Sequence, residues 1–152
     1  MKHIKFTRTL ALLLALTLVC LAFVACSKKE MSETGFCTIV IEGAPAVEYR
    51  VNLDKVTGTN GLIAVLDYLK EAEGLTYTES AGMLTEVGSV KQNTTLGNYV
   101  YIWTSVEKDF DLTQYASTKT YGDVMLTSSG VGAKDMTLTD GALIYIGIYT
   151  WG

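Results

Sequence analysis

Hydrophobic residues recur at every second position in several stretches of this chain, and at helical spacing in one. The stretch VEYRVNLD, residues 47–54, alternates apolar and polar residues throughout. Successive side chains of a strand point to opposite faces, so this stretch predicts a strand with one buried and one solvated face. The apolar stretch CTIVIEG, residues 37–43, predicts a partner strand. EGAPA between them, which holds the only proline, predicts the turn of a hairpin.

One helix is predicted, over the stretch TGTNGLIAVLDYLKEAEG at residues 57–74. Its apolar residues recur with helical spacing and share one face: Leu62, Ile63, Leu66 and Leu69. Thr59 or Asn60 can cap its start, and Gly74 suits its C-terminal end. Asn60-Gly61 is also a pair typical of tight hairpin turns, but the helical period that follows argues against a turn here.

After Gly74 the pattern predicts only strands and loops. Short strands are expected at residues 75–80, 83–90, 99–106, 124–129 and 142–151. The polar stretch between residues 107 and 123 is expected to be a loop. One early helix followed mostly by strands predicts an α+β domain, in which an antiparallel or mixed sheet carries the amphipathic helix on one face.

Aromatic side chains occupy alternate positions in two of these predicted strands, and they are the candidate ligand contacts. They are Tyr99, Tyr101 and Trp103 in one strand, and Tyr145, Tyr149 and Trp151 in the last, where Gly147 leaves a gap. In the last strand Ile144, Ile146 and Ile148 point the other way and are expected to pack under the helix. The rings then either cover the second face of the sheet as packing or form a recognition surface for a flat ligand.

The first 25 residues have the three parts of an export signal. Three basic residues lie within the first eight positions, an apolar run spans residues 10–24, and the small residue Ala25 directly precedes Cys26. The run is too short for a comfortable membrane span. Its Ala-Cys end resembles a bacterial lipobox, which implies cleavage before Cys26 and a diacylglyceryl thioether on the sulfur of that residue. An ordinary cleaved secretion signal is the competing interpretation.

The predicted domain order follows from this signal. Residues 1–25 are the signal peptide, residues 26–35 are the lipidated cysteine with a polar tether, and residues 36–152 are one folded domain. The domain is expected outside the cytoplasm, anchored to the bacterial cell membrane by its lipid. Three of the 12 basic residues and none of the 16 acidic ones lie in the signal, which leaves a net charge of −7. An acidic protein repels phosphate backbones, so nucleic acid is not an expected partner.

The processed chain lacks an imidazole, because the only histidine, His3, lies in the signal. Histidine-activated serine or cysteine nucleophiles and histidine metal sites are therefore excluded. Cys37 is the remaining thiol and is expected to be a small buried residue rather than a nucleophile. The alternating carboxylates Glu107, Asp109 and Asp111 lack the glycine and glutamate that an EF-hand needs at its sixth and twelfth positions. We expect no catalytic residue, metal or cofactor.

The order of the elements and several short motifs resemble the transcobalamin-like C-terminal domain family. The resemblance covers residues 36–151 with gaps. Its clearest part is the tail MTLTDGALIYIGIYTW, with Leu138, Asp140, Gly141, Ile144 and Tyr149. The helix GLIAVLDYLKEA and the strands GMLTEVGSV and GNYVYIWTS also fit the family pattern.

The resemblance implies a β-grasp-like fold and a role in ligand binding. In transcobalamin this domain covers one face of a corrinoid, and a separate helical domain supplies the rest of the site. The present chain departs from the family pattern at Tyr99, where Trp is usual, and at Thr104-Ser105, in place of Asn-Gly. The expected function is that of a membrane-anchored surface lipoprotein with a non-catalytic binding domain for a corrinoid-like or other flat small ligand. The alternative is a structural or adhesive module that binds another surface protein.

Overall fold

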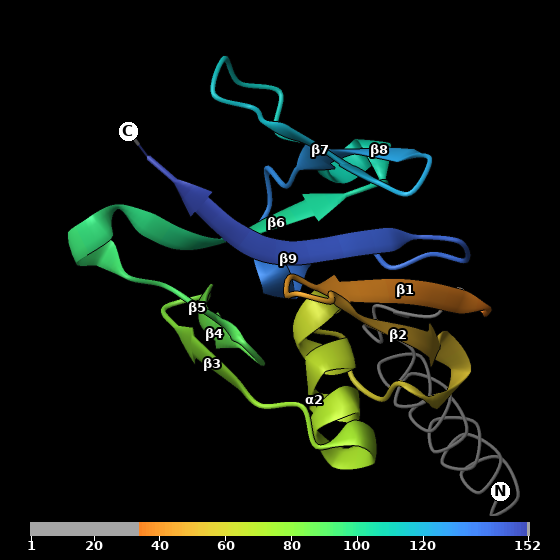
Figure 1. Ribbon diagram of the computed structural model, residues 1–152. Coiled ribbons are helices and arrows are strands. Elements are labelled where there is room, and N and C mark those ends of the chain that lie inside the picture. The colour runs from red at the N-terminus through yellow and green to blue at the C-terminus, as the bar shows by residue number, and fades with distance from the viewer. Residues whose placement is uncertain (1–33, 152) are drawn as a thin grey trace, which may run out of the picture. The chain divides into compact units, whose positions relative to one another are not determined.

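The computed structural model describes residues 34–151 of the chain (Figure 1). The predicted signal peptide and the predicted lipidation site, Cys26, lie outside these residues, so both stay predictions. The described residues form one compact unit, which contains every strand and helix named below. Because this unit has its own core, we expect residues 27–152 to fold without the signal. Within residues 34–151, no helix is long and apolar enough to cross a membrane.

The described residues form two sheets and one α-helix, α2, which spans Gly61–Glu73. The strands of the larger sheet are β1 Phe36–Ile41, β2 Val47–Asn52, β6 Asn98–Thr104, β7 Thr118–Tyr121, β8 Val124–Ser128 and β9 Leu143–Thr150. Their spatial order is β2-β1-β9-β6-β8-β7. The strands of the smaller sheet are β3 Tyr77–Ser80, β4 Met83–Val87 and β5 Val90–Lys91, which pair antiparallel in that order.

The first and last strands lie side by side at the centre of the larger sheet. β1 pairs with β9 in parallel, and every other neighbouring pair of this sheet is antiparallel. The helix lies on one face of the sheet (Figure 1), so the predicted α+β, β-grasp-like class is confirmed. A loop was predicted over residues 107–123. The prediction was wrong for residues 118–121, which form β7. The pair Gly122-Asp123, typical of hairpin turns, joins β7 to β8.

The helix packs against the aliphatic face of the larger sheet, as predicted for the last strand. The residues that meet there with 2 % or less of their surface exposed include Ile39, Ile41, Ile144, Ile146, Leu62, Leu66 and Leu69. Burial of each such side chain contributes about 1.5–3 kcal/mol. Cys37 lies in the same core, where burial raises the pKa of its thiol to about 11. The thiol therefore stays protonated at neutral pH, and Cys37 is a small buried residue, as expected.

Glycine stands at both ends of α2. Gly74 has the left-handed φ of 71°, and its N–H donates to the carbonyl of Leu69, which confirms the predicted C-terminal end. Asn60 occupies the N-terminal cap position, but its side chain makes no capping bond. Gly61 has a φ of 52° and lies against the segment that precedes β9. A Cβ at Gly61 would lie 2.8 Å from the carbonyl oxygens of Ala133, Lys134 and Met136.

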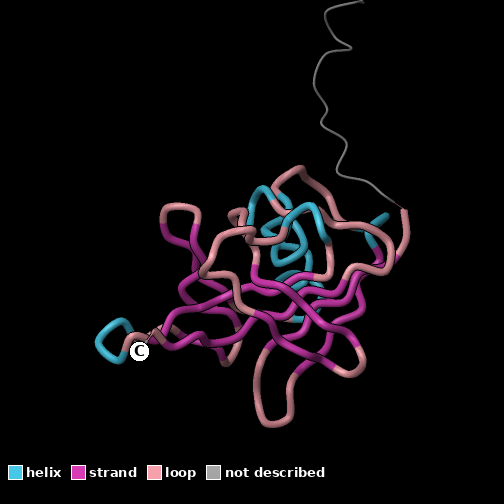
Figure 2. The backbone as a smooth tube through the Cα atoms, turned by 90° about the horizontal axis from the view of Figure 1, so that it is seen from above, coloured by secondary structure: helices cyan, strands magenta, loops and turns pink. Residues whose placement is uncertain are grey.

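The larger sheet is curled rather than flat. Neighbouring strands lie about 4.8 Å apart, so the edge strands β2 and β7 would lie roughly 24 Å apart in a flat sheet. Instead the hydroxyl of Tyr121 on β7 donates to Glu48 Oε2 on β2 at 3.1 Å. Figure 2 shows the strands crossing one another instead of lying in one flat layer. The face opposite the helix therefore lies inside the curl.

Candidate binding site

The structure divides the six predicted aromatic residues into three pairs of different exposure. The inner pair is Trp103 and Tyr145, the middle pair is Tyr101 and Tyr149, and the outer pair is Tyr99 and Trp151. The inner pair is buried, with 3 % and 6 % of its surface exposed, and the middle pair is half-buried. The outer pair is exposed, at 38 % and 48 %. The middle and outer pairs therefore have surface to offer a ligand, and the inner pair does not.

The inner pair forms a small second core inside the curl of the sheet, together with Val40 and Leu126. We call these four residues the inner cluster. The rings of Trp103 and Tyr145 meet edge to face with 6.1 Å between their centroids. The indole Nε1 of Trp103 donates to Ser117 Oγ at 2.9 Å, which satisfies its donor inside the protein. The inner cluster is thus packing, not an open platform.

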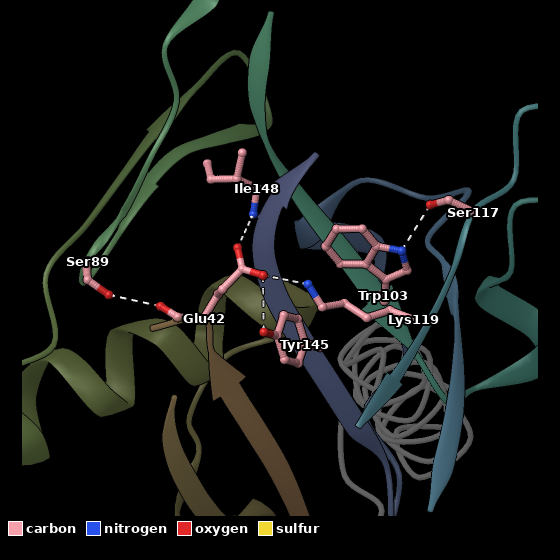
Figure 3. Close-up of polar contacts among 7 residues, drawn as sticks. All are labelled: Glu42, Ser89, Trp103, Ser117, Lys119, Tyr145 and Ile148. Atoms are coloured by element: carbon pink, nitrogen blue, oxygen red, sulfur yellow. Dashed lines mark hydrogen bonds and ion pairs between the residues drawn. The ribbon is translucent and has the colours of Figure 1, made fainter. Parts of the chain in front are cut away.

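An ion pair covers the inner cluster, where Glu42 and Lys119 meet over β9 (Figure 3). Lys119 Nζ lies 2.5 Å from Glu42 Oε1, and 4.8 and 4.2 Å from the ring centroids of Trp103 and Tyr145. Cation–π attraction to two rings adds to the ion pair. The second oxygen of Glu42 accepts the N–H of Ile148 at 2.8 Å. Three parts of the larger sheet are therefore joined through one carboxylate.

These contacts set the acidity of Glu42. Burial by itself raises the pKa of the carboxyl, since it penalises the charged form. The hydrogen bonds from Lys119, Ile148 and Tyr145, together with the charge of Lys119, outweigh burial and hold the pKa below its ordinary value of 4.5. Glu42 is therefore charged at neutral pH.

Gly147, the gap in the aromatic stripe, makes room for this carboxylate. A Cβ at Gly147 would lie 2.8 Å from Glu42 Oε2 and 2.9 Å from the ring of Tyr145. Any larger residue would therefore push Glu42 away from the main chain of β9. Sequence reasoning missed Glu42 because it precedes its partner Ile148 by 106 residues and stands where the predicted strand meets the predicted turn.

We expect Glu42→Gln to lower the free energy of unfolding at neutral pH by about 1–2 kcal/mol, because charge-assisted hydrogen bonds are lost. The loss is no larger because 33 % of the Glu42 side chain is exposed, and solvent screens its charge. A carboxyl whose pKa is lowered by folding stabilises the protein above its ordinary pKa, and this contribution is lost as the pH falls through the lowered value. The difference in unfolding free energy between the wild type and the variant should therefore become smaller below pH 4.5.

Urea unfolding of residues 27–152 at neutral and at acid pH measures this difference. Lys119→Met is the matched variant, because it removes the other charge of the pair. Glu42→Gln should have little further effect in that background. A difference that is the same at both pH values would contradict the role given to the charge.

A groove of about 460 Å³ opens beside the N-terminal half of β6. We call it the edge groove. Residues 99–102 of β6, Met83 at the start of β4, Val131 and Trp151 contribute to its lining, and every lining residue is uncharged. Successive side chains of a strand point to opposite faces. Four consecutive residues can line one groove only if the groove runs along the edge of the strand.

The edge groove brings together half of the predicted contacts, namely the outer pair and Tyr101. The inner pair and Tyr149 do not line it. Sequence reasoning missed Met83 and Val131, which are 69 % and 36 % exposed. Val131 stands between two glycines, Gly130 and Gly132, and no local pattern indicates which part of the fold it faces. Whether any of the six aromatic residues contacts a ligand stays a prediction.

Two of the alternating carboxylates make structural hydrogen bonds. Asp109 is buried, with 4 % exposed, and accepts the N–H of Thr137 at 2.6 Å and its hydroxyl at 3.0 Å. Asp111 accepts the N–H of Thr113 at 2.8 Å, within one loop. Across residues 34–151 there is no group of three or more histidine, cysteine, aspartate and glutamate side chains that could hold a metal ion.

No protein-family model matches this chain, and no curated protein matches it. The resemblance to the transcobalamin-like domain stays a prediction.

Proposed function

We propose that this protein is a non-catalytic binding protein that holds its ligand in the edge groove, outside a bacterial membrane to which the lipid on Cys26 anchors it. The observation that carries the proposal is the exposed pair Tyr99 and Trp151 in the lining of an uncharged groove. Exposed apolar surface of this kind is typical of binding sites, and tyrosine and tryptophan are enriched there. A volume of about 460 Å³ lies within the range of small-molecule sites.

The lining favours a ligand with a flat or apolar part. Tyr99 and Trp151 are the contacts we propose, with Tyr101 half-buried behind them. A corrinoid, which the family resemblance suggests, is a flat ring with amide groups at its rim. A whole corrinoid is larger than the groove, so the groove would hold one edge of it and a partner protein would cover the rest.

A structural or adhesive role is the second candidate, and exposed apolar side chains beyond the groove support it. Leu96, Leu112 and Tyr115 are 63 %, 91 % and 61 % exposed. The ring of Tyr115 lies 6.4 Å from that of Trp151, so the apolar surface continues past the groove. Surfaces that extend in this way are typical of protein-binding sites. In this candidate the groove receives a segment of another surface protein.

A dye titration of residues 27–152 tests the proposed function. N-phenyl-1-naphthylamine is neutral, flat and apolar, and its emission rises when it leaves water. We expect saturable binding that Tyr99→Ala or Trp151→Ala weakens about tenfold, since each removes a large contact surface. Cobinamide and cobalamin then serve as competitors, with correction for their own absorption.

Met125→Ala is the matched control, because Met125 is an apolar residue with 70 % of its surface exposed that does not line the groove. Its dye affinity should equal that of the wild type. No saturable binding, or an equal loss in all three variants, would overturn the proposal. Dye binding that the corrinoids do not displace would keep the groove as the site and remove the corrinoid as its ligand.

A further inference from the structure

Strand β6 is paired along one side but only in part along the other. It pairs with β9 along its whole length, from Asn98 to Thr104. On its outer side it pairs with β8 only at Trp103 and Thr104. Ser129 extends this pairing by one bond, since its N–H donates to the carbonyl of Ile102 at 2.8 Å. Beyond Ser129 the segment that follows β8 makes no further main-chain bond to β6.

The other end of the outer side is closed by Asn93. Asn93 and Asn98 exchange two main-chain hydrogen bonds, each of 2.9 Å. Main-chain groups of an antiparallel strand alternate between its two sides. The main-chain groups of Asn98 and Ile102 form hydrogen bonds on the outer side of β6. Val100 stands between them, so its N–H and carbonyl also point to the outer side.

These outward groups of Val100 have no partner within residues 34–151. No main-chain or side-chain hydrogen bond of the described residues reaches the N–H or carbonyl of Val100 on this side, or the N–H of Ile102. The edge groove lies along the same stretch, since residues 99–102 all line it. An occupant of the groove therefore meets a donor and an acceptor of the main chain as well as apolar side chains.

We propose that the edge groove binds an extended peptide segment of a partner protein, which adds as a short strand to the open outer side of β6 at Val100. The segment would accept the N–H of Val100 and donate to its carbonyl, as in other cases of strand addition. Alternate side chains of the segment would then enter the groove between Met83, Val131 and Trp151. This inference rests on the proposed function, because it takes the same groove as the binding site.

The acidic balance of residues 34–151 favours a basic segment. Residues 34–151 carry 14 acidic and 7 basic side chains. Two of the carboxylates stand beside the lining: Glu79 accepts the N–H of Gly82 at 2.7 Å, and Asp135 Oδ2 would lie 3.9 Å from a Cβ at Gly132. Lysine or arginine residues next to the apolar positions of a segment would face these carboxylates. The expected partner thus presents an extended run of apolar residues with basic neighbours.

Four heptapeptides test the proposal with residues 27–152. Each alternates an apolar residue with threonine between terminal lysines, as in KVTVTVK, and the apolar residue is valine, isoleucine, leucine or phenylalanine. Each has a matched partner with N-methyl groups on its central amides, which removes the main-chain donors and keeps the side chains. We expect at least one peptide to bind by fluorescence anisotropy, and its N-methylated partner to bind about tenfold more weakly.

Two readouts report on the strand itself. Binding should slow the amide hydrogen exchange of Val100 and Ile102 about tenfold or more, and leave that of Tyr99, already bonded to β9, unchanged. Val100→Pro removes the outward donor and also changes a side chain that lines the groove, and peptide affinity should fall. Circular dichroism checks that this variant is folded, and the N-methylated peptides carry the test if it is not.

The outcomes separate this inference from the proposed function. Dye binding without binding of any of the four peptides would overturn strand addition and leave the groove as a small-molecule site. Equal affinity of a peptide and its N-methylated partner, with unchanged exchange at Val100, would also overturn strand addition. Absence of both dye and peptide binding would overturn the two proposals together.

Discussion

We expect Trp103→Ala to lower the free energy of unfolding by about 3–5 kcal/mol, the loss typical of a large aromatic side chain removed from a core. Only 3 % of Trp103 is exposed, and its ring contacts Tyr145, Tyr101 and the ammonium group of Lys119. Removal of the indole leaves a cavity inside the curled sheet. The half-buried ammonium group of Lys119 also loses its cation–π contact with that ring. Urea unfolding of residues 27–152, followed by circular dichroism, measures the loss.

Two matched variants test whether the loss of stability depends on the buried position of the Trp103 ring. Trp103→Phe keeps an aromatic ring and loses the indole bond to Ser117, so it should cost only about 1 kcal/mol. Trp151→Ala removes a side chain with 48 % exposed and should change stability by about 0.5 kcal/mol or less. Equal destabilisation by Trp151→Ala and Trp103→Ala would contradict the division of the rings into inner and outer pairs.

Gly61→Ala should be nearly as damaging, with an expected loss of about 3 kcal/mol or more. A β-carbon at a left-handed residue costs about 1–2 kcal/mol by itself. At Gly61 it would also meet three main-chain oxygens at 2.8 Å, and main-chain atoms cannot turn aside as a side chain can. The start of α2 would therefore be pushed away from residues 133–136, against which it packs.

Gly74→Ala, at the other end of the same helix, is the control for Gly61→Ala. Gly74 has a similar φ of 71°, but a Cβ there would meet nothing within 4 Å. We expect Gly74→Ala to lower the free energy of unfolding by about 1–2 kcal/mol, which is the cost of a β-carbon at a left-handed residue. The difference between the two variants in thermal and urea unfolding gives the cost of the close contact. Equal losses would show that the contact with residues 133–136 contributes nothing.

The clearly alternating strands β2 and β9 were predicted correctly, whereas β7 was missed and the single strand predicted over residues 83–90 is two strands, β4 and β5. β2 and β9 alternate because each buries one face, and α2 has the apolar stripe of a helix packed on a sheet. β7, by contrast, reads TKTY and has no buried residue. Its place depends on contacts of its side chains with distant partners, such as Lys119 with Glu42 and Tyr121 with Glu48.

The candidate site was predicted only in part, for the same reason. Alternation placed Tyr145 on the face opposite the helix, which is correct, but it left the face of Trp103 open. It also could not show whether the face opposite the helix is open or enclosed. The curl that encloses it arises because the sheet brings β7 over β9, where the ring of Tyr121 lies 5.7 Å from that of Tyr145. Met83 and Val131 reach the groove from two further segments, and no local pattern joins them to β6.

By itself the sequence determined the α+β class, the helix with its C-terminal glycine, the two faces of the last strand and the six aromatic residues to examine. These features depend on spacing along the chain and on the two alternating sides of a strand, which are local properties. Only the tertiary structure decided which rings are buried and that β6 is left open at Val100. Both follow from how far β8 pairs with β6 and from how β7, paired with β8, lies over the sheet. That path is set by contacts between residues far apart in the chain.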